Sequence, residues 1–211
     1  MFKKDISSQV IKRLPRYYSF LGELSNSGIK RISSAELSRR MGLTASQIRQ
    51  DLNCFGGFGQ QGYGYNTDIL REEIGNILGI DKPKKAILIG LGNLGRAVAL
   101  HINFEDKGFN LIGMFDSKES LVGTVIRNTP VRSTNSLDDF CRENKPEAAI
   151  LCIPKEAVPS IAEHLIKLGV KGFLNFSHYD LSLKFDNIVV ENVHFGDNLM
   201  TLSYGIKNMD K

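Results

Sequence analysis

The hydrophobic positions follow two different patterns along the chain. Up to about residue 80, apolar residues recur every three or four positions, as on one face of a helix. After residue 85, short continuous apolar runs alternate with helical stretches. The first pattern predicts a small, mostly helical domain over residues 1–80, and the second predicts β-α alternation around a largely parallel sheet. The polar, proline-containing segment 81–85 is the expected linker.

Within the first domain, the apolar spacing predicts a series of short helices. These are expected over residues 6–13, 16–25, 35–41, 45–55 and 67–78, with a short strand at 30–32. Pro15 is expected in the first turn of the second helix, where its missing amide is harmless. Ser33 and Thr44 each stand three residues before Glu or Gln, which is the spacing of a capping box. Gly42 separates the two helices that they begin.

Two helices joined by a tight turn with glycine are typical of a helix-turn-helix, whose second helix enters the major groove. Gln and Asn suit hydrogen bonding to adenine, and Arg suits guanine or a phosphate. Residues 1–65 carry a charge of +6 and the remainder −2, which favours a polyanion at the first end. The candidate DNA-binding residues here are Thr44, Ser46, Gln47, Arg49, Gln50 and Asn53. An ordinary helical hairpin with a polar outer face would give a similar pattern.

Residues 56–65 interleave glycines with aromatic residues, which predicts a β-hairpin and therefore a winged helix. Gln60 and Gln61 at its tip and Tyr63 are further DNA-binding candidates. Because the tip is neutral, it would have to contact DNA through backbone amides and hydrogen bonds. A hairpin that merely caps the small core is the alternative.

The second domain begins with a strand, a glycine turn, a helix and a second strand. An apolar run at 86–89 leads into a G-x-G-x-x-G motif at 90–95, and a second run at 109–115 ends on Asp116. Asp116 lies 21 positions after Gly95, near the spacing of about 20 expected of the acid that binds ribose hydroxyls. This order predicts a dinucleotide-binding Rossmann domain over residues 86–193, with a doubly wound α/β sheet. A glycine turn without a ligand is the alternative.

Asp116 would repel a 2′-phosphate, which favours NAD over NADP. A buried strand at 148–153 ends beside the same cleft, so its last residues would give the nicotinamide an apolar surface. The candidate cofactor-binding residues are Gly90, Leu91, Gly92, Asn93, Leu94, Gly95, Asp116, Ser117, Lys118, Ile153 and Pro154.

Composition adds few constraints. The chain has 211 residues, 42% hydrophobic and 24% charged, with no apolar run near the ~20 residues of a membrane span and no signal peptide, so we expect a cytoplasmic protein without membrane contact. Cys54, Cys141 and Cys152 lack the spacing of a metal site or disulfide framework, so no metal is expected. Cys152, beside the cleft, could be a redox-reactive thiol. A partly apolar helix at 197–207 would dock either on a partner subunit or on its own domain.

A set of motifs spread over nearly the whole chain resembles the redox-sensing transcriptional repressor Rex family. The motifs are LPRYY at 14–18, ISSAEL at 32–37, IRQDL at 48–52, FG at 55–56, GYGYN at 62–66, IGLGNLG at 89–95, FD at 115–116 and GFLNF at 172–176. The resemblance implies a homodimer in which the last helix, residues 194–211, is swapped into the other subunit. It also implies that NAD⁺ permits binding to a palindromic double-stranded operator, whereas NADH releases the repressor.

Three positions depart from that family's pattern. Ser19, His101 and His194 stand where the family often has Arg, Tyr and an acid, groups that the resemblance assigns to redox coupling. Two other functions stay open. One is a small NAD-dependent dehydrogenase with a histidine as proton donor, although the histidines fall in no catalytic constellation that we recognise; the other is a sensor of coenzyme A or another nucleotide.

Overall fold

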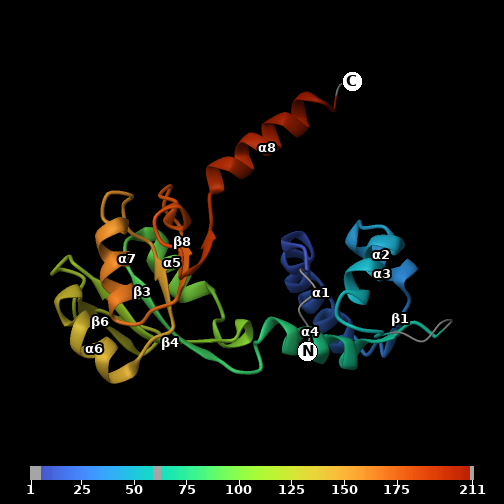
Figure 1. The fold of residues 1–211 in the computed structure, drawn as a ribbon, viewed down its shortest axis with the longest axis horizontal. Helices are drawn as coiled ribbons and strands as arrows, with labels where there is room; N and C mark the ends of the chain where they lie inside the picture. Colours follow the sequence, from blue (N-terminus) through green and yellow to red (C-terminus); the bar gives the residue numbers. More distant parts are fainter. Residues whose placement is uncertain (1–5, 59–62, 210–211) are drawn as a thin grey trace. The chain divides into compact units, whose positions relative to one another are not determined.

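The computed structural model describes residues 6–58 and 63–209, and the chain forms two compact units. The first is Met1–Lys82 and the second Pro83–Lys211, so they divide within the polar segment that precedes the first long strand (Figure 1). Among the residues described, no helix is long and apolar enough to cross a membrane.

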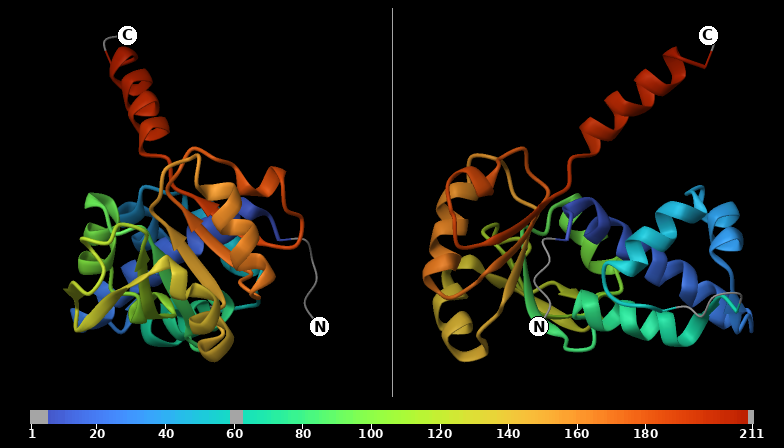
Figure 2. Two further views of the ribbon diagram at one scale, coloured as in Figure 1. Left: turned by 90° about the vertical axis from the view of Figure 1, so that its left-hand side faces the viewer. Right: turned by 45° about the vertical axis from the view of Figure 1, so that its right-hand side comes forward.

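The N-terminal unit packs four helices around one hydrophobic core. They are α1 (Ser8–Asn26), α2 (Ser34–Met41), α3 (Ala45–Asn53) and α4 (Thr67–Leu78). Figures 1 and 2 show α1 and α4 side by side. Their apolar stripes supply much of the core, with Leu14 and Leu21 of α1 and Ile74 of α4 completely buried. The i, i+3 and i+4 spacing in the sequence therefore predicts this core correctly.

The prediction that Pro15 separates two helices is wrong, because α1 is one helix of 19 residues with Pro15 inside it. Its buried residues, from Val10 to Leu24, lie on a single core-facing stripe. Pro15 itself is exposed, so the carbonyl left without a partner, that of Ile11, can be reached by water. Burial of the continuous stripe outweighs the local cost of proline.

The caps of α2 and α3 follow the expected pattern. The Ser33 hydroxyl accepts a hydrogen bond from the Glu36 amide, and the Thr44 hydroxyl accepts one from the Gln47 amide, both at 3.1 Å. Gly42 ends α2 with a φ of +66°, a conformation that glycine adopts without strain. The Glu36 carboxylate pairs with Arg39 and Arg40, so this helix start has the hydroxyl half of a capping box.

The strand of the expected wing has a partner that the sequence analysis did not identify. β2 (Tyr65–Asn66) pairs antiparallel with β1 (Arg31–Ile32), a pairing that the predicted hairpin over 56–65 did not include. Gly64 permits the close approach, because its φ is +69° and a Cβ there would lie 2.6 Å from the Ile32 carbonyl oxygen. Gln60 and Gln61 lie outside the described residues.

A seven-stranded sheet organises the C-terminal unit in the order β5-β6-β4-β3-β7-β8-β9. The strands are β3 (Lys84–Ile89), β4 (Phe109–Asp116), β5 (Val125–Ile126), β6 (Thr129–Ser133), β7 (Ala148–Leu151), β8 (Gly172–Asn175) and β9 (Val189–Asn192). All pairs are parallel except β5 with β6. Without β5, this is the strand order of a doubly wound dinucleotide-binding fold, which reverses between β3 and β7.

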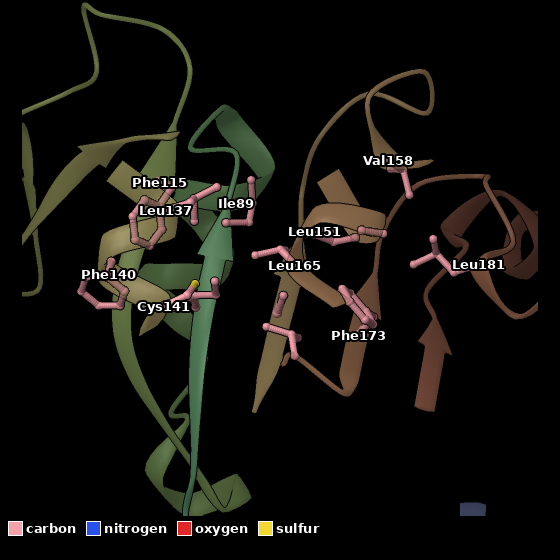
Figure 3. Close-up of a cluster of buried hydrophobic side chains, with 14 residues drawn as sticks. Ile89, Phe115, Leu137, Phe140, Cys141, Leu151, Val158, Leu165, Phe173 and Leu181 are labelled. Atoms are coloured by element: carbon pink, nitrogen blue, oxygen red, sulfur yellow. The ribbon is translucent and has the colours of Figure 1, made fainter. Parts of the chain in front are cut away.

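Helices cover both faces of this sheet. The helices are α5 (Asn93–His101), α6 (Leu137–Asn144) and α7 (Val158–Lys167). Alternate residues of β3 face opposite sides: Ile87 and Ile89 pack with α6 and α7, whereas Ala86 and Leu88 pack with α5. Figure 3 shows the first of these clusters, in which Phe115 and Phe140 meet edge to face. Burial on both faces explains why the strands are continuous apolar runs.

The last helix, α8 (Phe195–Lys207), buries none of its 13 residues. Figure 1 shows it running away from the sheet that precedes it. The alternative that this helix docks on its own domain is therefore wrong. Large apolar side chains are exposed along it, including Leu199, Leu202 and Ile206 at 57–66% of their full exposure.

The position of Pro15 generates a stability prediction. Replacing Pro15 with Ala restores a helix hydrogen bond on an exposed face, at the cost of a more flexible unfolded chain. We expect Pro15→Ala to raise the free energy of unfolding by about 2 kcal/mol, since proline costs ~3 kcal/mol inside a helix. Urea denaturation followed by circular dichroism measures this. Lys12→Ala, on the same exposed side, is the control and should change it by less than ~0.5 kcal/mol; a destabilised Pro15→Ala variant would contradict the prediction.

Candidate functional site

A cavity of about 550 Å³ opens where the carboxyl ends of β3, β4 and β7 meet. This is the point at which the strand order reverses, and loops leaving neighbouring strands in opposite directions leave a crevice there. The residues lining it are Ile89, Gly90, Gly92, Asp116, Ser117, Thr134, Cys152, Ile153, Pro154, Ala157, Ser160 and Ile161.

The three motif glycines each have a separate steric role. Gly90 has a φ of +92°, and a Cβ there would lie 2.5 Å from the Cys152 carbonyl oxygen. At Gly95 a Cβ would lie 1.8 Å from the Gly90 carbonyl oxygen, so α5 can approach β3 only without a side chain. By contrast, the space in front of Gly92 is open, with nothing within 4 Å of a Cβ. A backbone exposed at that point fits the close approach of a pyrophosphate.

The first turn of α5 begins at the edge of the same cavity, because Gly92 lines it. Its N-cap is Gly92, and no side chain caps the turn. Uncapped amides at a helix start, together with the positive end of the helix dipole, form an anion site. Asn93 and Leu94 are exposed on this turn, so they would offer amides rather than buried side-chain contacts.

Asp116 connects the glycine turn to the end of β4. One of its carboxylate oxygens accepts the Leu91 amide at 2.6 Å, and the other accepts the Lys118 amide at 2.8 Å. The side chain of Leu91 is 1% exposed and belongs to the core, whereas Lys118 is exposed. Asp116 therefore holds the turn in shape and still lines the cavity.

Six of the eleven predicted cofactor residues line the cavity, namely Gly90, Gly92, Asp116, Ser117, Ile153 and Pro154. The sequence analysis missed five lining residues: Ile89, at the end of the predicted strand 86–89, and four from later in the chain, Thr134, Ala157, Ser160 and Ile161. Thr134 follows the end of β6, so the rule that parallel strands end at one edge could have identified it. The other three lie at the start of α7, and no motif marks them.

The cavity also bears on the hypothesis of a reactive thiol. Burial raises the pKa of Cys152 to about 12, so the thiol stays protonated at neutral pH. Because the thiolate is the reactive form, this environment argues against redox chemistry at Cys152. All three cysteines are free thiols. Within the described ranges, no group of three or more His, Cys, Asp or Glu residues could hold a metal ion.

A second candidate surface lies on α3 in the N-terminal unit. Ser46, Arg49, Gln50 and Asn53 are exposed on it, while Thr44 uses its hydroxyl to cap the helix. Arg49 donates to the Ser34 hydroxyl at 3.0 Å, which holds the guanidinium over the start of α2. Tyr63 is 69% exposed, and Arg31 donates to its carbonyl oxygen at 3.4 Å while lying 5.9 Å from its ring centre.

The sequence analysis missed Asp51, which is 1% exposed between α1 and α3. It forms an ion pair with Arg13 at 2.6 Å and accepts hydrogen bonds from Tyr17 and Gln47 at 2.9 and 2.8 Å. Burial alone would raise the pKa of Asp51, but these donors outweigh burial and the pKa is lowered. A carboxylate between Ile48 and Leu52, on the buried stripe of a helix, was the available signal, since such a group requires a cationic partner.

The three residues proposed for redox coupling lie in different settings. Ser19 is exposed on α1 in the N-terminal unit, and His101 is exposed at the last position of α5. His194 precedes α8 and stacks on His178 with ring centres 4.8 Å apart. Its ring nitrogens lie 3.0 Å from the Ser177 carbonyl oxygen and 3.3 Å from Asp197.

Two family models match the chain. A model described as the putative DNA-binding protein N-terminus matches residues 5–53, and a CoA binding domain model matches residues 81–179. The first match covers α1 to α3, and the second covers the glycine turn and the cleft.

Relatives and solved structures match almost the whole chain. A redox-sensing transcriptional repressor Rex from Caldicellulosiruptor saccharolyticus is 50% identical over 96% of this chain and 92% of its own length. The solved structure of RSP, a Rex-family repressor, in complex with β-NAD⁺ and operator DNA has a TM-score of 0.90 and 48% identity, covering 99% of this chain and 95% of that one. Its complex with β-NADH has a TM-score of 0.88 and 46% identity, covering 99% and 97%. The chain belongs to the redox-sensing transcriptional repressor Rex family.

Proposed function

We propose that this protein is a DNA-binding transcriptional repressor that senses the NADH/NAD⁺ ratio and leaves its operator when NADH binds. One observation carries the proposal: a chain with a basic helix-turn-helix also holds a cleft whose glycine turn fits a dinucleotide. The repressor RSP, 48% identical, has been solved with β-NAD⁺ and operator DNA, and also with β-NADH. The proposal assigns DNA binding to residues 1–80 and nucleotide binding to 86–193, joined by 81–85.

The residues of the cleft have separate roles in this proposal. The amides that open α5, above all those of Asn93 and Leu94, receive the pyrophosphate, and Gly92 lets it approach the backbone. Asp116 accepts hydrogen bonds from the ribose hydroxyls, and its charge disfavours a 2′-phosphate. Ile153 and Pro154 provide an apolar wall for the nicotinamide.

Regulation requires two arrangements of the protein that ligand and DNA prefer differently. We propose a homodimer on a palindromic operator, in which residues 194–211 are swapped into the other subunit. The exposed state of α8 supports this, since a helix of 13 residues is marginal in water without packing. Ser19, His101 and His194 are the proposed coupling residues, and His194 lies at the base of α8.

Coenzyme A is a second candidate ligand, because the family model that covers the cleft is described as a CoA binding domain. It would use the same phosphate site at the start of α5. A dehydrogenase is a weaker alternative: the matching relatives are named as repressors, and we propose no catalytic role for any residue.

The main prediction concerns ligand-dependent DNA release. Added NADH should weaken operator binding about 5- to 150-fold at fixed salt, the range of a typical allosteric coupling, and equal NAD⁺ should not. Fluorescence anisotropy with a labelled palindromic operator measures this. Parallel titrations with NADPH and coenzyme A identify the ligand. Release by coenzyme A and not by NADH would replace the ligand assignment, and no effect of any of the four would refute the sensor.

Asp116 is predicted to set the affinity and the choice of nucleotide. Asp116→Asn removes the negative charge and replaces one acceptor oxygen by a donor nitrogen. NADH should therefore bind about 10- to 100-fold more weakly, and the preference for NADH over NADPH should become smaller. Titration of NADH and NADPH fluorescence gives both values. Glu119→Gln, an exposed neighbour, is the matched control. Equal selectivity in the two variants would remove Asp116 from the proposed role.

The exposed face of α8 is predicted to hold the dimer together. Phe195, Leu199, Leu202 and Ile206 share one side of the helix at spacings of three and four, so a charge at Leu202 should be buried in a dimer at high cost. We expect Leu202→Glu to shift the protein towards monomer in sedimentation velocity. Thr201→Glu, on another side of α8, should leave the dimer intact. A Leu202→Glu dimer as tight as the parent would exclude α8 from the interface.

A further inference from the structure

The carboxylate of Asp51 has all its strong acceptor positions occupied by four donors. One oxygen accepts from Arg13 Nε at 2.6 Å and from the Tyr17 hydroxyl at 2.9 Å. The other accepts from Arg13 Nη2 at 2.8 Å and from Gln47 Nε2 at 2.8 Å. The four donor atoms belong to three side chains of α1 and α3, all of them buried or half-buried, so the network has little room to rearrange.

This network fixes which way the Gln47 amide faces. An ionised carboxylate can only accept hydrogen bonds, so the atom of Gln47 beside Asp51 must be the amide nitrogen. The lowered pKa of Asp51 keeps the carboxylate ionised. Asp51 takes up one N–H of the Gln47 amide, which leaves the carbonyl oxygen as the acceptor of that side chain and the second N–H as a donor beside it. Gln50 is exposed, and no side chain of the described residues holds its amide in this way.

Gln47 also lies in the first turn of α3. It is the third residue of the helix, after Ala45 and Ser46, and N-terminal residues of a recognition helix contact base edges. In the major groove, only adenine N6 and cytosine N4 are amino donors, whereas guanine O6 and thymine O4 are acceptors. An outward-facing carbonyl oxygen would be attracted to the first pair and repelled by the second.

We propose that Asp51 is a positioning residue that orients Gln47 to accept a hydrogen bond from the exocyclic amino group of adenine or cytosine in each operator half-site. Arg13 and Tyr17 hold Asp51 from α1, so the orientation of a base-reading side chain depends on the packing of α1 against α3. The inference rests on the proposed function, because it assumes that α3 reads DNA.

Binding to a panel of operators tests the proposal. Every base pair of one half-site is substituted in turn, and each adenine is also replaced by 2-aminopurine, which lacks the amino group at C6. Affinity is measured by anisotropy at fixed salt. We expect one position at which losing the amino group weakens binding about 5- to 100-fold. Gln47→Met should abolish the preference at that position and leave the others unchanged, while Gln50→Met should alter a different position.

The role of Asp51 is tested by two variants and one direct measurement. In Asp51→Asn, the new amide can donate to the Gln47 oxygen, so this variant should weaken the base preference that Gln47 provides. Tyr17→Phe leaves the Asp51–Gln47 hydrogen bond intact, so it should retain that base preference. If Asp51→Asn does not fold, NMR of the unmodified protein decides: the side-chain amide protons of Gln47 should exchange with solvent more slowly than those of Gln50. The resonances are assigned from the Met variants.

Some outcomes would overturn the inference while leaving the proposed function standing. The first is that Gln47→Met leaves the preference for each operator base unchanged. The second is a preference for guanine or thymine at the position that Gln47 contacts, and the third is equally fast solvent exchange of the Gln47 and Gln50 side-chain amides. If the unmodified protein instead fails to distinguish its operator from unrelated DNA, the DNA-reading function itself is wrong.

Discussion

The nucleotide cleft depends on one steric constraint, the approach of α5 to the end of β3. A Cβ at Gly95 would lie 1.8 Å from the Gly90 carbonyl oxygen, so no other residue permits this packing unchanged. The approach places the first turn of α5 beside the carboxyl end of β3. It also places the glycine turn where Asp116 can bind the Leu91 amide. Gly92, Asp116 and Ile153 then line one cavity.

In the N-terminal unit, the buried carboxylate of Asp51 has a corresponding organising role. Removing it from water is costly, and the cost is offset because hydrogen bonds from Arg13, Tyr17 and Gln47 satisfy both of its oxygens. The Asp51–Arg13 pair therefore requires one particular packing of α1 against α3. A hydrophobic pair of similar size would leave the Gln47 amide without its Asp51 acceptor.

Within the C-terminal unit, α8 differs from the rest of the chain in what stabilises it. Each unit has its own core, whereas α8 exposes Leu199, Leu202 and Ile206 and contacts the rest of its unit near its first turn, where Phe195 approaches Phe176 and His178 stacks on His194. Because α8 buries none of its residues, its stability depends on packing against another surface.

Much of the architecture is legible in local patterns. Glycine spacing, apolar runs and cap residues predict the strand–turn–helix at 86–101, the helices from α2 to α4 and the acid at the end of β4, because these depend on neighbours within a few positions. Long-range packing settled the rest. Because of such packing, α1 continues through Pro15 and β2 pairs with β1. The same kind of contact places Thr134 and Ser160 at the cleft, and Asp51 beside Arg13, 38 residues away. These contacts join residues that are far apart in the sequence and leave no local pattern in it. They could therefore be identified only from the folded structure.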